Sequence, residues 1–197
     1  MNVNTSMSIV GILDGLSLTI EGLREIGKII FAMAKIIGVI KPEVNIEEIG
    51  DKAIQAEMDG IVPEKYDNYS DYLSEIEKYV VDPERSQKIS QDSKELKGIE
   101  IAISLIVEKF VNMPVLDFIK EICANPENFD NGIIEAYSEI INQDPSFISD
   151  YVRYVNGTEK NAEIIKRISG TLVNVEKNVH PEISEKDAYK YVMQLRK

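Results

Sequence analysis

Apolar or small side chains recur at intervals of four and three along residues 7–40. They are Ile9, Leu13, Leu16, Ile20, Leu23, Gly27, Ile30, Ala34 and Ile37. This spacing places them on one face of a helix, so the sequence predicts a long helix over residues 7–40, ended by Pro42. A second apolar stripe begins inside the same segment. It comprises Ile26, Ile29, Met33, Ile36 and Ile40. A helix that is apolar on two faces is covered by the core, by a partner or by lipid.

A β-hairpin is the competing interpretation of this first segment. Asp14 and Gly15 lie between two apolar runs, and residues 16–21 alternate between apolar and polar side chains. The helical period extends over a much longer stretch than this alternation. The hairpin therefore ranks second.

A second strongly apolar helix is predicted over residues 96–113. Its main stripe consists of Leu96, Ile99, Ile103, Ile106, Phe110 and Met113. Ile101 and Leu105 add another apolar face, and Asp92 with Glu95 resembles a capping box at the start. We expect this helix to pack near residues 26–40, because each buried Ile or Phe stabilises the fold by about 1.5–3 kcal/mol.

Shorter helical patterns fill most of the remaining chain. They cover residues 46–59, 69–81, 114–124, 133–142, 145–156, 158–179 and 184–195. Gly60 ends the first of these, Thr158 is the expected N-cap of the longest, and Ser184 with Asp187 resembles a capping box. The fold class predicted is all-α: an irregular multi-helix bundle of about eight or nine helices, two of them long and mostly buried.

The domain organisation follows from length and local polarity. A chain of 197 residues is long enough for one helical domain spanning residues 1–197. Residues 84–91 are polar and lack a helical apolar pattern apart from Ile89. The alternative is therefore two lobes, 1–83 and 92–197, joined by a polar linker at 84–91.

The net charge of the chain limits the kinds of partner that it can bind. The chain has 22 Lys and Arg against 34 Asp and Glu, a net charge of -12. The excess is concentrated in residues 42–84, which hold thirteen acidic and three basic residues. This balance argues against binding nucleic acid through its phosphates, which requires a basic surface. A solvated face or a docking surface for a basic partner explains such a run.

The rarity of Cys and His excludes several kinds of disulfide and metal site. One Cys and one His cannot form a disulfide framework, a Cys/His zinc cluster or a two-His metal centre. We expect no metal and no cofactor, and magnesium bound by acidic residues is the alternative that stays open. Cys123 lies in an apolar run and is expected to be a buried structural thiol. His180 precedes Pro181 between two predicted helices and is expected to be an ordinary loop residue. No basic residue precedes the first apolar stretch, so we expect no typical signal peptide and a cytoplasmic location.

One stretch resembles a phosphate-binding loop. Gly22, Gly27 and Lys28 have its spacing, but Ile29 stands where the motif needs Ser or Thr, so these glycines are expected to be part of the helix. Charged residues interrupt residues 7–40 too often for a membrane span, and an interfacial helix is the weaker alternative. A membrane role is therefore not expected.

Four tyrosines lie in the acidic segment, and they have two interpretations. Either their rings cover the core of a half-buried helix, or they form a contact patch for a basic partner. The candidate partner-binding residues are Tyr66, Tyr69, Asp71, Tyr72, Glu75 and Tyr79. The candidate assembly interface is the second stripe of the first helix: Ile26, Ile29, Met33, Ile36 and Ile40.

The favoured hypothesis is a non-enzymatic structural or interaction protein that assembles with itself, as a homo-oligomer, or with a protein partner. It depends on the surplus of apolar helix surface and on the clustered acidity. The first alternative is an acidic inhibitor, of the immunity or nucleic-acid-mimic kind, that binds a basic protein. A small helical enzyme that uses carboxylates is the next, and a membrane-inserting protein comes last.

Overall fold

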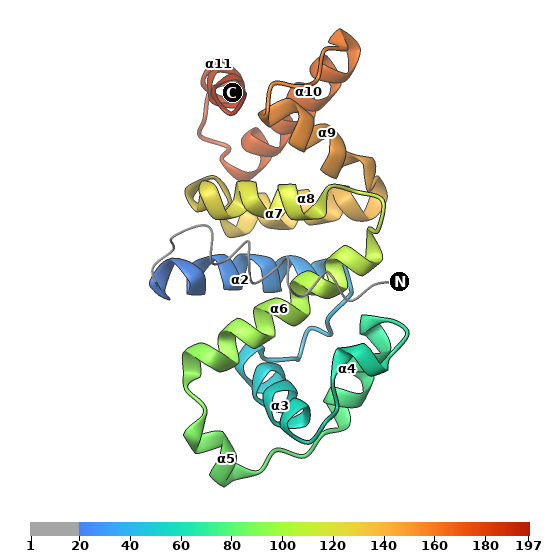
Figure 1. Ribbon diagram of the computed structural model, residues 1–197. Coiled ribbons are helices and arrows are strands. Elements are labelled where there is room, and N and C mark those ends of the chain that lie inside the picture. The colour runs from blue at the N-terminus through green and yellow to red at the C-terminus, as the bar shows by residue number, and fades with distance from the viewer. Residues whose placement is uncertain (1–19) are drawn as a thin grey trace. The chain divides into compact units, whose positions relative to one another are not determined.

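The computed structural model describes residues 20–197, and all regular structure among them is helical (Figure 1). The ten α-helices are α2 (Ile20–Ile36), α3 (Ile46–Met58), α4 (Tyr69–Lys78), α5 (Pro83–Lys88), α6 (Gln91–Lys109), α7 (Val115–Ala124), α8 (Asn131–Gln143), α9 (Ser146–Val155), α10 (Ala162–Val179) and α11 (Glu185–Gln194). Two short 3-10 helices, η1 (Pro63–Lys65) and η2 (Pro126–Asn128), lie between them. The all-α prediction is confirmed, with slightly more helices than expected. The predicted hairpin and the start of the first helix fall outside the described residues.

The chain divides into two compact units, unit 1 up to Val111 and unit 2 from Asn112 onward. This boundary differs from the linker expected at residues 84–91. Those residues belong to unit 1 and include α5, whose N-cap Asp82 accepts hydrogen bonds from the amides of Glu84 and Arg85. The acidic N-cap followed by proline is a helix start, and this local signal outweighs the missing apolar pattern.

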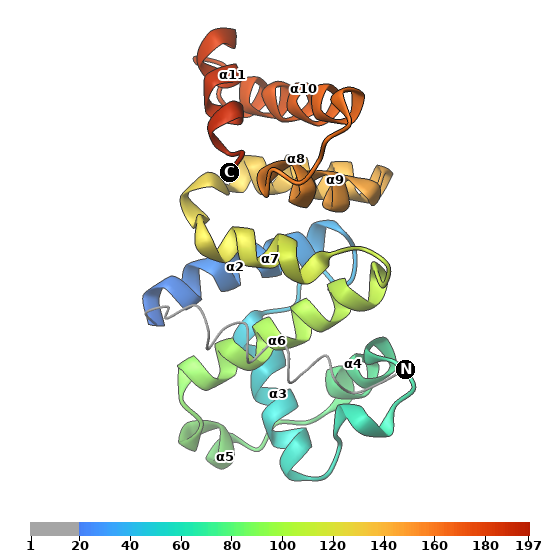
Figure 2. The same cartoon turned by 45° about the horizontal axis from the view of Figure 1, so that its top comes forward.

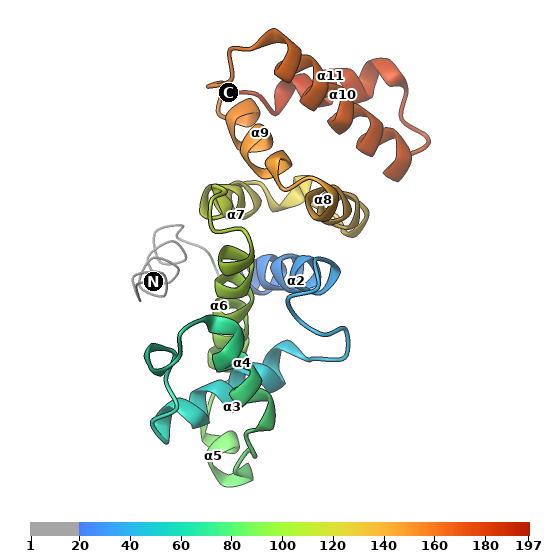
Figure 3. The same cartoon turned by 90° about the vertical axis from the view of Figure 1, so that its right-hand side faces the viewer.

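Unit 1 is organised around α6, which packs against both α2 and α3 (Figure 3). The α3–α6 crossing is close enough for backbone to meet backbone. A methyl group added at Gly98 would lie 2.3 Å from the carbonyl oxygen of Ile46, and one at Gly50 would lie 1.8 Å from that of Lys94. On α2, a methyl group added at Gly27 would instead meet the side chain of Ile99, 2.4 Å from its Cδ1. The glycine of the suspected phosphate loop is therefore a packing residue of α2.

Helix α2 ends at Ile36, earlier than the predicted residue 40. Gly38 has a φ of 75°, and the amide of Val39 donates to the carbonyl of Ala34 while the amide of Gly38 donates to that of Lys35. This pair of bonds is the Schellman ending, which requires a left-handed residue that glycine supplies without steric strain. The glycine therefore stops the helix before Pro42 can do so.

Two of the predicted helix starts are wrong in detail, and one is confirmed. Ser90 caps α6 by accepting from the amide of Ser93, whereas the suspected capping residues Asp92 and Glu95 bind Arg24 of α2. Asn161, and not Thr158, caps α10. Ser184 caps α11 and accepts from the amide of Asp187, as expected.

Unit 2 has an aromatic core shared by α7, η2, α8 and α9. Its rings lie with centroids 5.2–6.3 Å apart and mostly edge to face, a favourable geometry for aromatic pairs. They belong to Phe118, Phe129, Tyr137, Phe147 and Tyr151. Helix α10 packs on α8 and α9, and α11 lies along α10 (Figure 2). Cys123 is buried on α7 as expected, and burial raises the pKa of its thiol to about 11.

Residues 20–197 include no helix with the length and hydropathy needed to cross a membrane.

Candidate functional site

Helix α4 carries most of the predicted partner-binding residues, and it is fixed against its neighbours α3 and α6. Asn68 caps its start by accepting from the amide of Asp71. Glu108 of α6 accepts from the backbone amides of Tyr69 and Ser70 and, at 2.6 Å, from the Ser70 hydroxyl. A carboxylate at this end of a helix satisfies amides that have no partner within the helix. The orientation of the tyrosines is therefore set by α6.

Three of the four tyrosines turn inward. Tyr72 is fully buried, and its hydroxyl donates a 3.0 Å hydrogen bond to Glu57 of α3. The rings of Tyr66 and Tyr69 lie 5.7 and 5.3 Å from the ring of Tyr72. Burial raises the pKa of both Tyr69 and Tyr72. Of the two interpretations of the tyrosines, these three side chains therefore follow the one in which the rings cover the core.

A half-buried lysine completes this group. The ammonium of Lys97 lies 2.7 Å from Glu57 and 2.9 Å from Glu100, and its side chain is 14% exposed. Burial works to lower the pKa of Lys97, but Glu100 and Glu57 together outweigh it and raise that pKa. We call Glu57, Tyr72, Lys97 and Glu100 the Lys97 cluster. Each charge in it has an opposite charge in contact, which is the arrangement of a structural polar group.

The fourth tyrosine, Tyr79, lies just past the end of α4 and at the surface. Its hydroxyl donates a 2.5 Å hydrogen bond to Asp59, which raises the pKa of Tyr79, and Arg85 lies 2.7 Å from the other oxygen of Asp59. Two large apolar side chains flank this contact along the chain: Met58, 63% exposed, and Val80, 86% exposed. We call Met58, Asp59, Tyr79, Val80 and Arg85 the Tyr79 patch.

The acidic segment does not present all its charge to solvent. More than half of its carboxylates form ion pairs with Lys or Arg in unit 1. They are Glu48, Asp51, Glu57, Asp59, Glu75, Glu77 and Asp82. Asp51 is buried between Lys94, Gln55 and Ser86. About half of the acidic run is therefore paired, partly within its own helices and partly with cations such as Lys94 and Lys97 of α6.

The predicted assembly stripe is mostly covered within the chain. Ile26, Met33 and Ile40 are buried, Ile29 is half-buried, and Ile36 is 36% exposed. The second apolar face of the first helix therefore serves mainly as core in this structure.

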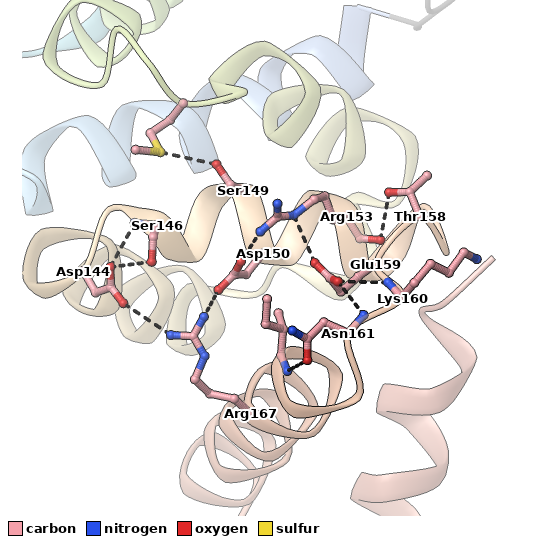
Figure 4. A network of polar contacts seen from close by, with 12 residues as sticks. Asp144, Ser146, Ser149, Asp150, Arg153, Thr158, Glu159, Lys160, Asn161 and Arg167 are labelled. Atoms are coloured by element: carbon pink, nitrogen blue, oxygen red, sulfur yellow. Dashed lines mark hydrogen bonds and ion pairs between the residues drawn. The ribbon is translucent and has the colours of Figure 1, made fainter.

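Unit 2 contains a polar network that the sequence did not reveal (Figure 4). Asp150 of α9 is buried and pairs with two guanidinium groups, Arg153 at 2.6 Å and Arg167 of α10. Arg153 also reaches Glu159 at 3.3 Å, and Glu159 accepts from the amides of Lys160 and Asn161. These bonds lower the pKa of Glu159, and they tie the loop before α10 to α9.

Buried carboxylates elsewhere in the described chain also pair with a Lys or Arg, with one exception. Lys94 pairs with Asp51 and Lys197 with Glu121, each at 2.8 Å. Glu176 of α10 is equally buried, yet within residues 20–197 it has no Lys or Arg partner and no side-chain hydrogen bond. Burial raises the pKa of Glu176, and Asp130 adds to this effect while His180 opposes it.

The position of Glu176 could have been noticed in the sequence. It follows Leu172 by four residues and Ile168 by eight, so it lies on the apolar stripe of its helix. His180, expected to be an ordinary loop residue, forms the C-cap of α10 and lies 3.1 Å from Asp130, the N-cap of α8.

A surface cavity of about 290 Å³ bears on the enzyme hypothesis. It is lined by Lys41, Glu43, Val44, Glu48, Ile49, Lys52 and Glu77. Lys41 pairs with Glu77 at 2.5 Å and Lys52 with Glu48 at 2.9 Å, so both ammonium groups of the cavity are engaged by its own carboxylates. In the part of the chain that the structure describes, no group of three or more His, Cys, Asp or Glu side chains is placed to hold a metal ion.

Two features therefore differ from the mutually paired polar groups around them: the exposed Tyr79 patch in unit 1 and the buried Glu176 in unit 2. Known proteins add nothing to their interpretation, because comparisons of the chain with protein-family models, with curated proteins and with solved structures found no match.

Proposed function

We propose that this chain is a non-enzymatic helical binding protein and that the Tyr79 patch docks on a partner protein. The observation that carries this proposal is the exposure of Met58 and Val80. They are the two most exposed of the large apolar side chains described, and along the chain they flank the polar contact between Tyr79 and Asp59. Covering such side chains is a source of binding free energy.

The composition of the patch supports the same function. Tyr, Arg and Met are enriched at protein interfaces, and Tyr and Arg are frequent among the residues that dominate binding. The exposed carboxylates of Asp82 and Glu84 lie next to the patch in the sequence. The partner surface that fits is therefore apolar at its centre and basic at its rim.

The patch is also preorganised. Asp59 follows α3, Tyr79 follows α4 and Arg85 belongs to α5, and their hydrogen bonds join the three elements. A side chain that is already held in place loses less conformational entropy on binding. Tyr79 and Arg85 therefore offer contact area at a reduced entropic penalty.

A photo-crosslinking residue tests this proposal. We would place benzoylphenylalanine at Val80 of the full chain, in its native host, and use Val111 as the control site, because Val111 is 55% exposed in the same unit. We expect a defined crosslinked protein from position 80 and not from position 111. The crosslink is expected to weaken at high salt and to disappear in the variant Met58→Asp, whose circular dichroism should be unchanged.

The outcomes separate the possible partners. A crosslink to a second copy of the chain, accompanied by a dimer in sedimentation, assigns the patch to self-assembly. A crosslink to another protein assigns it to a heteromeric complex. Equal crosslinking from positions 80 and 111, or none from either, contradicts a docking role for the Tyr79 patch.

A further inference from the structure

Glu176 and Asp150 form a natural pair for comparison. Both belong to unit 2, and both are 5% exposed. Asp150 lies between the guanidinium groups of Arg153 and Arg167. Glu176 has neither a basic partner nor a side-chain hydrogen bond among the described residues. It lies nine residues after Arg167 on α10, about 14 Å along the helix axis, beyond the reach of that network.

The surroundings of Glu176 come from every helix that packs on α10. Helix α8 contributes Tyr137 and its N-cap Asp130, α9 contributes Tyr151, and α11 contributes Tyr191. At the C-cap of α10, His180 is a group able to carry a positive charge that acts on Glu176, and it lies 3.1 Å from Asp130.

None of the other cations on α10 and α11 pairs with Glu176, and Lys166, Lys186 and Lys190 are exposed. Lys177 of α10 pairs with Glu185 of α11, and Arg167 pairs with Asp150 of α9 and with Asp144. The titratable groups that interact electrostatically with Glu176 are therefore three tyrosines, one histidine and one acidic neighbour.

An ionised carboxylate in such a place is unfavourable. Removing a charge from water without a compensating partner is costly, and a buried acid responds by keeping its proton. The pKa of Glu176 is accordingly raised by burial and by Asp130. A carboxyl group whose pKa is higher in the folded than in the unfolded chain stabilises the fold at low pH, and this stabilisation is lost as pH rises through the folded pKa.

We propose that Glu176 makes the α10–α11 part of unit 2 a proton-responsive element, which packs tightly while the carboxyl group is protonated and opens when it ionises. Helix α11 is the part that moves. It has ten residues, of which only Ala188 and Val192 are buried. Elements with few buried contacts open at the lowest free energy, so a charge introduced beside Tyr191 acts first on this helix.

Hydrogen exchange of the full chain tests this device. We would compare the opening equilibrium of the α11 amides at pH 5 and pH 7.5, after correction for the intrinsic exchange chemistry. We expect opening to increase at least about threefold at the higher pH, and one linked proton limits the increase to about tenfold per pH unit. Glu176→Gln is expected to open as rarely at pH 7.5 as at pH 5.

Two matched variants locate the response. Asp150→Asn changes an equally buried acid that has cationic partners, so it should weaken unit 2 at both pH values and leave the pH dependence in place. His180→Gln removes the only other group of this site that gains a positive charge on protonation. The response should persist in His180→Gln and vanish in Glu176→Gln.

The opposite pattern overturns the proposal. A pH response that Glu176→Gln retains and His180→Gln loses assigns the effect to the histidine, and α11 amides that exchange equally at both pH values show that there is no switch. If Glu176→Gln does not fold, a carbon NMR titration of the Glu176 carboxyl in the unmodified chain decides. A midpoint at or below that of exposed glutamates contradicts the proposal.

Discussion

Both units bury tyrosines beside a glutamate, but the glutamates differ in burial and in partners: Glu57 of unit 1 is half-buried and contacts a lysine, whereas Glu176 of unit 2 is buried. In unit 1 the hydroxyl of Tyr72 donates to Glu57, and Lys97 lies between Glu57 and Glu100. In unit 2 Tyr137 and Tyr151 are near Glu176, where no Lys or Arg within residues 20–197 contacts the carboxylate. Burial and a contacting cation act in opposite directions on the pKa of an acid. A cation in contact keeps it ionised, and its absence favours the proton.

This contrast also separates two kinds of stability. The ionised Lys97 cluster needs all of its members, because removing one leaves an uncompensated charge in place. Glu176 instead becomes neutral by binding a proton that the solvent provides. The first site joins α3, α4 and α6 through contacts between opposite charges, while the second couples its helices to the acidity of the solution.

Removing the lysine of unit 1 is expected to have the largest effect. Lys97→Met leaves Glu57 and Glu100 facing each other without a cation, so unfolding free energy should fall by about 3 kcal/mol at pH 7. Part of this loss should be regained on acidification, because the variant makes unit 1 resemble the Glu176 site. Urea denaturation across pH measures both effects.

The control variant is Lys78→Met, at an exposed pair with Glu75, which should change stability by less than about 0.5 kcal/mol. A similar loss in both variants contradicts the special role of Lys97.

The close crossing beneath the Lys97 cluster provides the second prediction. Gly98→Ala would place a methyl group 2.3 Å from the carbonyl oxygen of Ile46, and this forces α3 away from α6 and Glu57 away from Lys97. We expect a loss of about 2 kcal/mol in thermal or urea unfolding. Gly170→Ala on α10, where a methyl group meets nothing within 4 Å, should instead stabilise by about 0.5–1 kcal/mol. If both alanines shift stability in the same direction, the close-approach argument is wrong.

The smallest changes in stability are expected from removing single tyrosine hydroxyl groups. Tyr72→Phe removes the donor to Glu57 and should destabilise unit 1 by about 1 kcal/mol. Tyr151→Phe removes a hydroxyl that makes no hydrogen bond within the described chain, so its effect should stay within about 0.5 kcal/mol. Denaturation of the two variants under the same conditions compares them directly. Equal losses would mean that the hydroxyl of Tyr151 has a partner as good as Glu57.

The helices themselves could be predicted because apolar spacing and burial obey the same geometry. The stripe from Ile99 to Phe110 is buried on α6, and α6 packs against α2 as expected. Helix ends were harder to predict, since several residues compete for the same role. Gly38 and Asn161 prevail over Pro42 and Thr158 through hydrogen bonds that depend on local backbone angles.

The candidate site was only partly predictable for a related reason. Tyr72 and Tyr79 are seven residues apart and would share a helix face with Ile76, but α4 ends at Lys78, so Tyr79 leaves that face and reaches Asp59. Which cation meets which carboxylate depends on how distant helices come together. Lys97 with Glu57, and the absence of such a partner at Glu176, have no signature in local spacing.

The single cysteine of the chain offers a use of its own. Cys123 is enclosed on α7 beside the aromatic core, and its thiol has a pKa of about 11. A thiol-specific reagent can reach it only when this region opens. The rate of covalent labelling at Cys123 therefore measures how often this part of unit 2 opens. No reporter needs to be engineered into the protein.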